Sequence, residues 1–466
     1  ADATGAVRSG GTDLEFNARL DDVNRVVPQM NGPLTLKGDV SQTLTQISGT
    51  VRLDGPDNSF ADVQGMLATD GDIDLTYDVT LNRTEQFLPQ FPGTLMAKGT
   101  AKRSGPAWQI ETDAQGPGGI IAEITGALDP SEDIALDLRL AEPAGGPVST
   151  LLKIPERPSL LLTAKGQGPL VDFTADITLA SDEVERLGGQ VRLNRIAAPT
   201  APARAAPSIG FAADLAGDIS PLLAAAYREF FGRDVQLALD GRTDPDGRVA
   251  IENFDLTARS MILNGDLDLA GNGLVERAVV RGRIAQPTGD AVVLPLPGPP
   301  TTIGSAMISA QLGANQPDSW DLRLNIDDLA STQVNLARAE VDASGTLDQL
   351  ENMHLTGTIA AALRGIGLSD PALDQAIGSQ VRLNSDFQLI EQSTLNLAKT
   401  VLTGIDYSAK LDAEISGLDG DIRFDGQAEA RAQNLARFSG LAGRPIGGSV
   451  RASAKGNGAA TGETFD

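Results

Sequence analysis

Apolar side chains recur at every second position in many segments of this chain. Two uninterrupted runs are Ile73–Leu81 and Ile405–Ile415, in which aliphatic residues and one tyrosine each alternate with polar or charged residues. Because successive side chains of a β-strand point to opposite faces, this period gives each strand one apolar face and one wet face. The chain must therefore fold mainly into sheets that shelter one of their two faces.

The unit that the rest of the chain repeats with variations lies between residues 219 and 284. It opens with an expected helix over Ser220–Phe231, with serine at the N-cap, proline at N1 and Gly232 just past its end. Strands follow, joined by a turn at Asp244–Gly247. The apolar phase changes along the second strand, which predicts a bulge or corner near Glu252–Asn253.

The same order of short helix, glycine and strand recurs at irregular spacing. The cassettes lie near Gly32, Gly93, Gly188, Gly232, Gly378 and Gly443. Irregular spacing disfavours a solenoid of fixed period and favours a meander interrupted by helices. The other helical pieces are expected over residues 84–91, 182–187, 369–377 and 434–442.

Composition limits how the core can be built. The chain has 466 residues, which exceeds the usual size of a single compact core, and aromatic residues make up only 4% of it. Leucine, valine, isoleucine and alanine must supply the apolar surface, which suits a thin sheet interior or a smooth aliphatic trough. We expect three groove segments, 1–143, 159–285 and 303–466, with linkers near 143–158, 197–208 and 286–302.

Charge and missing motifs exclude several classes of function. Acidic residues outnumber basic ones by 62 to 37, so a nucleic acid is an unsuitable partner, and anionic headgroups are disfavoured on average. The chain has no cysteine, a single histidine, and no nucleotide-binding or hydrolase signature. We expect no enzyme, no catalytic residue, no cofactor and no metal site.

Two local motifs, together with the strand pattern, resemble a known family. The helix Ser220–Gly232 with its following strands, and the element Leu441–Gly448, are similar to the TamB family of the translocation and assembly module, within the AsmA-like superfamily. Over nearly all the rest of the chain, the similarity lies in the general pattern of alternating strands and short helices. No run reaches the length of a membrane span, and the chain starts at Ala1 and stops at Asp466 in mid-pattern. We therefore expect a middle segment of a longer protein.

The resemblance implies a fold and a role. Family members are anchored in the inner membrane, cross the periplasm and meet an outer-membrane barrel of the TamA type through a C-terminal domain. Both contacts would lie outside this chain. The middle is an elongated, curved, meandering antiparallel β-sheet, often called a β-taco. It is thought to carry phospholipid between membranes, and it is linked to assembly of outer-membrane proteins and autotransporters.

The residues agree with a mostly β chain that forms such a groove and has a few short helices. Acyl chains of phospholipid would lie along the aliphatic face, at about 0.8 kcal/mol per buried methylene. The strand pattern alone does not decide which face lines the groove. The expected lining residues are Ile73, Leu75, Val79, Leu81, Ile134, Leu136, Leu138, Val235, Leu237, Leu239, Leu263, Leu267, Leu269, Leu322, Leu324, Ile405, Leu411 and Ile415.

Two other readings compete with the lipid conduit. One is a structural β-repeat, such as an acidic adhesin, whose apolar faces close on each other and leave a dry, filled interior. The other is a chaperone for outer-membrane β-proteins, because the same groove would offer edges to nascent strands. An interior that stays open to solvent would favour the conduit over the adhesin.

Overall fold

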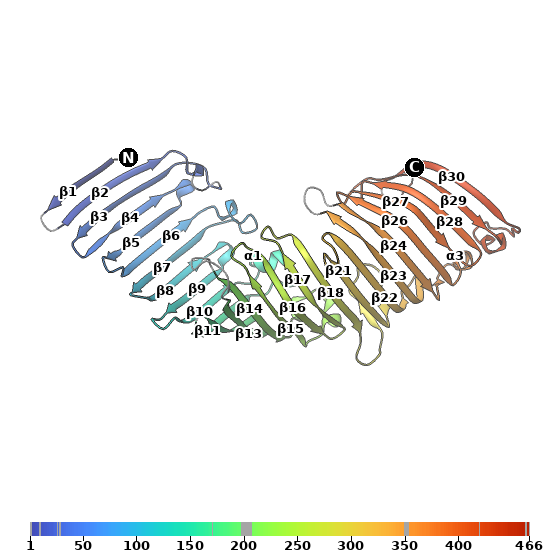
Figure 1. The fold of residues 1–466 in the computed structure, drawn as a ribbon, viewed down its shortest axis with the longest axis horizontal. Coiled ribbons are helices and arrows are strands. Elements are labelled where there is room, and N and C mark those ends of the chain that lie inside the picture. Colours follow the sequence, from blue (N-terminus) through green and yellow to red (C-terminus); the bar gives the residue numbers. More distant parts are fainter. Residues whose placement is uncertain are drawn as a thin grey trace. The chain divides into compact units, whose positions relative to one another are not determined.

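The computed structural model describes residues 2–8, 11–25, 27, 29–169, 171–196, 207–348, 354–418, 420–461 and 464–465. The chain divides into two units, residues 1–224 and 225–466. Each unit is an open antiparallel sheet with a few short helices (Figure 1), so the prediction of a mostly β fold is confirmed. The expected linker near 197–208 lies almost entirely outside the described residues.

The first unit is a meander in which each strand from β2 to β13 pairs with its neighbours in sequence. Its strands are β1 Asp2–Arg8, β2 Gly11–Leu20, β3 Leu34–Thr43, β4 Gln46–Asp54, β5 Phe60–Ala68, β6 Ile73–Leu81, β7 Leu95–Ser104, β8 Ala107–Gln115, β9 Ile121–Leu128, β10 Asp133–Glu142, β11 Leu160–Pro169, β12 Asp172–Ser181, β13 Val184–Ile196 and β14 Ser208–Gly217. Its helical pieces are η1 Val23–Arg25, η2 Pro56–Asn58, η3 Thr84–Gln86, η4 Pro117–Gly119, α1 Pro147–Leu151 and η5 Ser220–Leu222.

The helical pieces of the first unit gather where the even-numbered strands end. η1, η2, η3, η4 and α1 follow β2, β4, β6, β8 and β10, whereas short turns follow β3, β5, β7 and β9. Because neighbouring strands are antiparallel, alternate connections fall on the same side of the sheet. We call the side that carries η1–η4 and α1 the helical rim, and the opposite side the turn rim.

The second unit is also an antiparallel meander, but β18 pairs with β21 past the β19–β20 hairpin, and β24 pairs with β26 past β25. Its strands are β15 Val235–Thr243, β16 Val249–Ala258, β17 Met261–Leu269, β18 Val275–Ala285, β19 Val292–Leu294, β20 Thr301–Ile303, β21 Ser305–Leu312, β22 Ser319–Ala330, β23 Val334–Asp348, β24 His354–Arg364, β25 Gly367–Leu368, β26 Gln380–Ile390, β27 Thr394–Thr403, β28 Tyr407–Ser416, β29 Ile422–Ala432, β30 Val450–Thr461 and β31 Thr464–Phe465. Its helices are α2 Ala225–Phe231, α3 Pro371–Ile377 and η6 Leu435–Phe438.

The stretch 286–302 is not the linker that its prolines predict. It holds the hairpin of β19 and β20, whose Val292 and Ile303 are 0% and 1% exposed. These residues pack with Phe230 of α2 and Ala306 of β21 as the buried core cluster of the second unit. The proline-rich loop between the two strands therefore leads into and out of a core element. The stretch 143–158 likewise carries α1, and the sheet continues across it because β10 pairs directly with β11.

The expected helix over Ser220–Phe231 is broken in two. Leu223 is extended (ψ 150°) between η5 and α2, so Ser220 starts a short 3₁₀ turn and not a helix of three turns. Packing of Phe230 and Phe231 against the β19–β20 hairpin fixes α2 and overrides the local helix propensity. Gly232 follows the helix with φ 69°, as predicted.

Of the other predicted helices, one forms as expected, two are shorter and one is absent, and the predicted bulge is present. Residues 182–187 form no helix: Asp182 and Glu183 make a turn with φ 47° and 65°, and β13 then begins and pairs with β12. The pieces at 84–91 and 434–442 are shorter than expected. α3 forms as predicted, with the Asp370 side chain accepting from two backbone N–H groups of its first turn. The bulge in β16 lies at Glu252–Asn253, where the register shifts against β15 and β17.

We predict that Phe230→Ala lowers the free energy of unfolding of the second unit by about 3 kcal/mol or more, because it leaves a cavity among Val292, Ile303 and Ala306. Tyr227→Ala is the matched control, since Tyr227 lies on the same helix and is 42% exposed. Urea denaturation measures both changes. Equal losses in the two variants would contradict the assignment of Phe230 to the core.

Candidate functional site

Strand register brings the predicted lining residues of the first unit onto one face. Leu75 of β6 is linked through its cross-strand partners on β7, β8 and β9 to Leu136 of β10. Ile73 is linked in the same way to Ile134, and Tyr77 to Leu138. Cross-strand partners share a face, so these residues, with Val79 and Leu81, form one surface, the apolar face of the first unit.

The second unit has an equivalent apolar face. Leu237 pairs with Leu256, which pairs with Leu263, and the bulge at Glu252–Asn253 keeps Ile251 and Val249 of β16 on the same side, opposite Leu267 and Leu269. Further along, Ala310 and Ile308 of β21 pair with Leu322 and Leu324. Leu239, Leu411 and Ile415 also belong to this face.

Two predicted lining residues do not fit an open groove. Ile405 lies in the bend before β28, is 62% exposed and is not part of the strand, because the hairpin connection takes residues 404–406 and the ladder begins at Tyr407. Val235 is only 4% exposed, so it is closed off from a ligand. The remaining members keep their place on the strands.

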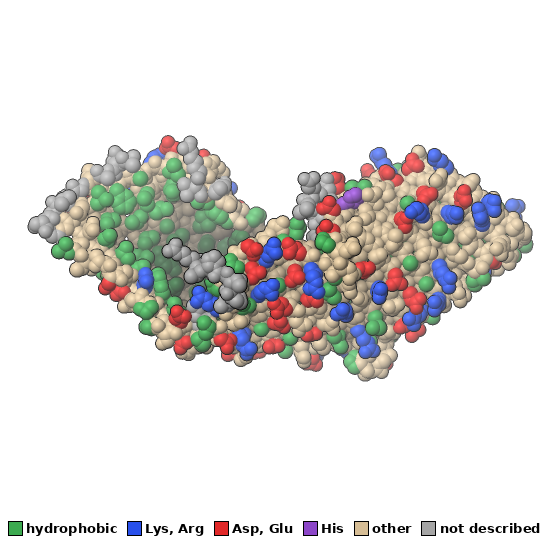
Figure 2. All heavy atoms as spheres, in the orientation of Figure 1, with side chains coloured by type: hydrophobic (Ala, Val, Ile, Leu, Met, Phe, Trp, Pro, Cys, Tyr) green, Lys and Arg blue, Asp and Glu red, His purple; other side chains and the backbone are tan. Residues whose placement is uncertain are grey.

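Much of the apolar face of the first unit is open to solvent. Figure 2 shows it as a hollow covered by hydrophobic side chains over the strands at the N-terminal end. Large members of this face that are more than one-third exposed include Leu14 (39%), Ile47 (39%), Leu67 (45%), Ile110 (43%), Leu140 (36%), Leu193 (40%) and Ile209 (43%). Contiguous exposed apolar surface is unusual in a soluble protein and marks a binding surface.

Aromatic rings on the apolar faces lie flat over glycines of neighbouring strands. A Cβ built on Gly38 would lie 2.6 Å from the Phe16 ring, and one on Gly99 would lie 2.6 Å from the Tyr77 ring. The space that glycine leaves is therefore filled by the ring beside it, so the ring lies against the sheet and does not project far from it. This arrangement depends on register, so the sequence alone did not reveal it.

In the second unit, two aromatic rings together cover a pair of glycines on adjacent strands. Trp320 faces Gly345, which pairs with Gly357, which in turn pairs with Phe387. The two rings meet over the glycines, with their centroids 6.0 Å apart. Both flanking rings thus cover two strands that carry no side chain in that row.

Several polar side chains on the apolar faces are paired or stacked. Tyr77 Oη lies 2.5 Å from Thr112 Oγ1, and Ser385 Oγ lies 2.6 Å from Thr400 Oγ1. Arg103 lies over the Trp108 ring, 5.6 Å from its centroid. Paired hydroxyls do not need a ligand to satisfy them, so these faces remain suited to apolar guests.

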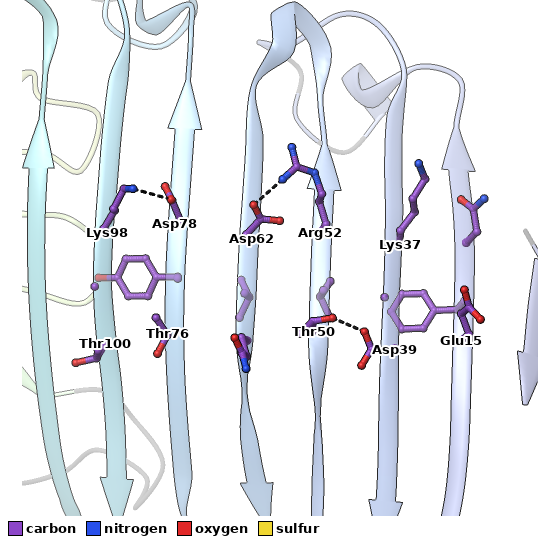
Figure 3. A pocket seen from close by; sticks show the side chains of 18 of the residues that line it. Glu15, Lys37, Asp39, Thr50, Arg52, Asp62, Thr76, Asp78, Lys98 and Thr100 are labelled. Carbon is purple, nitrogen blue, oxygen red and sulfur yellow. Dashed lines mark hydrogen bonds and ion pairs between the residues drawn. The ribbon is translucent and has the colours of Figure 1, made fainter. Parts of the chain in front are cut away.

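The opposite face of the first unit is polar and carries a shallow groove of about 1030 Å³ (Figure 3). Its floor is the backbone of the row that contains Val51 and Val63, and two rows of polar side chains form its walls. Lys98 pairs with Asp78 (2.9 Å) and Arg52 with Asp62 (2.6 Å). These charges neutralise each other across neighbouring strands, which is typical of a solvated outer surface.

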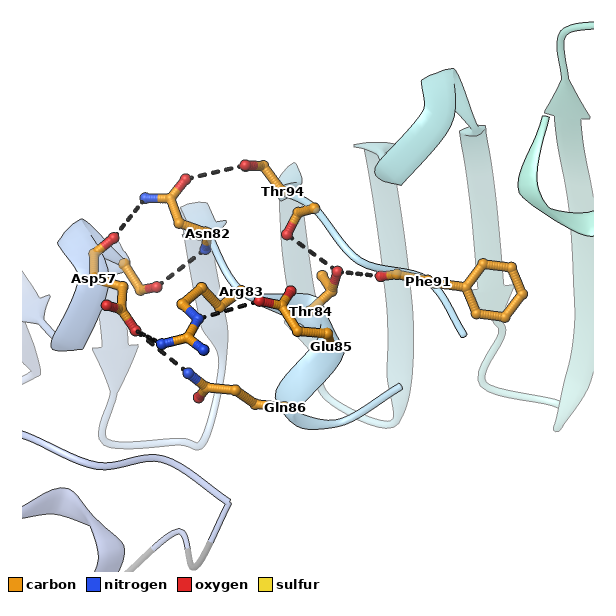
Figure 4. A network of polar contacts seen from close by, with 10 residues as sticks. Asp57, Asn82, Arg83, Thr84, Glu85, Gln86, Phe91 and Thr94 are labelled. Carbon is orange, nitrogen blue, oxygen red and sulfur yellow. Dashed lines mark hydrogen bonds and ion pairs between the residues drawn. The ribbon is translucent and has the colours of Figure 1, made fainter. Parts of the chain in front are cut away.

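A polar network ties the helical rim together between η2 and η3 (Figure 4). Asn82 Nδ2 donates to the carbonyl oxygens of Asp57 (3.1 Å) and Asn58 (3.0 Å). Arg83 pairs with Glu85 (3.1 Å) and Asp57 (3.4 Å). The hydroxyl of Thr84, which is 5% exposed, donates to the carbonyl of Phe91. The network holds the loop 82–94 in place at the rim.

Among the described residues, the carboxylate of Glu142 is the buried one, and its role is structural. Glu142 is 5% exposed and accepts hydrogen bonds from the backbone N–H groups of Val148 (2.7 Å) and Ser149 (2.8 Å). Both oxygens are thus used to bind the first turn of α1. The described residues hold no group of three potential metal ligands.

Comparisons with protein-family models, curated proteins and solved structures find no match. Within the part of the chain that the structure describes, no helix is long and apolar enough to cross a membrane. The candidate site therefore has to be judged on its own geometry, and the feature that stands out is the open apolar face.

We predict a pH-dependent contribution of Glu85 to stability. Hydrogen bonds from its own backbone N–H and from Arg83 lower the pKa of Glu85 from its ordinary value of 4.5. A lowered pKa in the folded state means stabilisation that is present above pH 4.5 and lost as the pH falls below it.

Thermal unfolding of wild type and Glu85→Gln between pH 7 and pH 3 measures this contribution. The difference in Tm should shrink as the pH falls. A difference that stays constant with pH would contradict a role for the charge. Glu414→Gln, at an exposed glutamate for which the structure gives no ion pair, is the control.

Proposed function

We propose that this chain is a lipid-conduit segment that shelters the acyl chains of phospholipids along its apolar faces. The observation that carries the proposal is the open apolar face of the first unit, where large aliphatic side chains such as Leu67, Ile110 and Leu193 are more than one-third exposed. A surface of this kind costs free energy in water, and acyl chains would offset about 0.8 kcal/mol of that for each methylene they bury.

The even aliphatic lining of this face supports an acyl chain that moves along it. Aliphatic side chains form continuous rows from strand to strand, and the aromatic rings lie flat over glycines such as Gly38 and Gly99. Tyr77 and Thr112, two of the polar residues on the face, are already paired with each other. No position in these rows would hold a methylene chain much more tightly than the next, which suits transport better than storage.

The open sheet also separates this proposal from a closed structural repeat. An adhesin-like sandwich would bury its apolar residues against a second layer, whereas Leu67 and Ile110 remain 45% and 43% exposed. The resemblance to the TamB family suggests the setting: a periplasmic segment between an inner-membrane anchor and an outer-membrane barrel of the TamA type, acting in phospholipid transfer and outer-membrane protein assembly. That setting belongs to the proposal.

We predict that the purified protein retains phospholipid, and that Leu75→Arg and Leu411→Arg each lower the retained amount several-fold. An arginine on the apolar face puts a charge in the path of the acyl chains, which is costly to desolvate. The matched controls are Thr76→Arg and Glu414→Arg, which lie on the same strands and point to the polar face. Native mass spectrometry after gentle purification measures bound lipid.

Circular dichroism keeps the test interpretable by showing that each variant is folded. Equal lipid content in the apolar-face variants and their controls would overturn the proposal. Retention of unfolded polypeptide in place of lipid would favour the hypothesis of a chaperone for outer-membrane β-proteins.

A further inference from the structure

The polar face of the second unit carries one groove unlike the others. It has a volume of about 410 Å³ and lies across β17, β18, β21 and β22. Arg281, Arg283 and Arg323 line it, and its lining contains no carboxylate. The grooves around Asp62, Asp74 and Asp342 each carry several carboxylates.

Two of these arginines lack a counter-charge. The structure gives Arg281 and Arg283 no ion pair with any described carboxylate, whereas Arg277 on the same strand and Arg338 on β23 each have one. Arg323 has only a loose contact with Asp342, at 3.6 Å and with both side chains more than two-thirds exposed. In a chain with a net charge of -25, two unpaired arginines beside a loosely paired third leave a local binding potential for an anion.

Apolar side chains flank the arginines on the same face. Ile262 and Met307 are the cross-strand neighbours of Arg283 on β17 and β21, and they are 48% and 60% exposed. A polar face normally carries charged or small polar residues in such rows, as the first unit does around Lys98 and Asp78. The groove therefore combines guanidinium groups with accessible apolar surface, which suits an amphiphilic anion.

The boundaries of the patch indicate a narrow ligand. The row that contains Arg281 runs from Asp255 on β16 through Arg323 to Asp342 on β23, so carboxylates stand at both ends. A planar anionic membrane would meet these acids together with the arginines. A short peptide laid along β18 can contact both arginines and avoid these acids, because its carboxylates at alternate positions, about 6.7 Å apart, match the spacing of Arg281 and Arg283 along that strand.

We propose that this basic groove, formed by Arg281, Arg283 and Arg323 with Ile262 and Met307, binds an acidic segment of a partner protein in which carboxylates alternate with apolar residues. Guanidinium groups bind carboxylates in a bidentate fashion, and the apolar side chains of the segment would cover Ile262 and Met307. This surface lies on the polar face, so it is separate from the proposed lipid path.

Fluorescence anisotropy with a labelled peptide of alternating glutamate and leucine tests the proposal on the full chain. We expect Arg281→Glu/Arg283→Glu to weaken binding more than about tenfold, because two charge-assisted contacts are reversed. The control Arg423→Glu/Arg444→Glu makes the same change in net charge at exposed arginines far along the second unit and should bind within about twofold of wild type. A peptide of alternating lysine and leucine should not bind.

A replacement variant and two further outcomes complete the test. If the double glutamate variant does not fold by circular dichroism, Arg281→Gln/Arg283→Gln replaces it, with the same expected loss. Equal affinity in the groove variants and the control would overturn the proposal. It would also fail if vesicles containing phosphatidylglycerol bound through these arginines and the peptide did not. Retained phospholipid should be unchanged in the arginine variants, so this test is independent of the proposed conduit.

Discussion

Backbone hydrogen bonding between antiparallel strands is the constraint on which the molecule depends. Each ladder fixes which residues stand opposite each other, and a shift of one residue would move a whole strand's apolar set to the wrong face. The bulge at Glu252–Asn253 shows how this is managed: the register shifts so that Ile251 and Phe254 both join the apolar face. The division into an aliphatic face and a charged face follows from this register and needs no large compact core.

Period-two alternation was enough to predict the mostly β fold and to place most lining residues. Leu75, Leu136 and Leu322 lie on apolar faces because their strands have no competing pattern. What could not be predicted depends on contacts between distant residues. The prolines of 286–302 indicate a linker, yet Val292 and Ile303 are buried because they meet Phe230, and no local pattern records that contact.

Glycine has two uses in this sheet that only the structure separates. At Gly232 and Gly378 it ends a helix with positive φ, which the sequence predicts. Gly38, Gly99 and Gly357 lie in extended strands, where the local sequence predicts only a weakened β propensity. There the missing Cβ makes room for a ring on a neighbouring strand. A low aromatic content thus goes with rings spread flat over the surface, in place of rings stacked in a deep core.

The confinement of η1–η4 and α1 to the ends of even-numbered strands has an evolutionary consequence. Two strands with their connecting segment form a module that begins and ends at the same rim. Duplicating or deleting such a module preserves strand direction and facial assignment in everything that follows, whereas a change by one strand would reverse both. The architecture can therefore change its span in steps of one hairpin, and insertions can diversify one border while the rows of facing side chains stay intact.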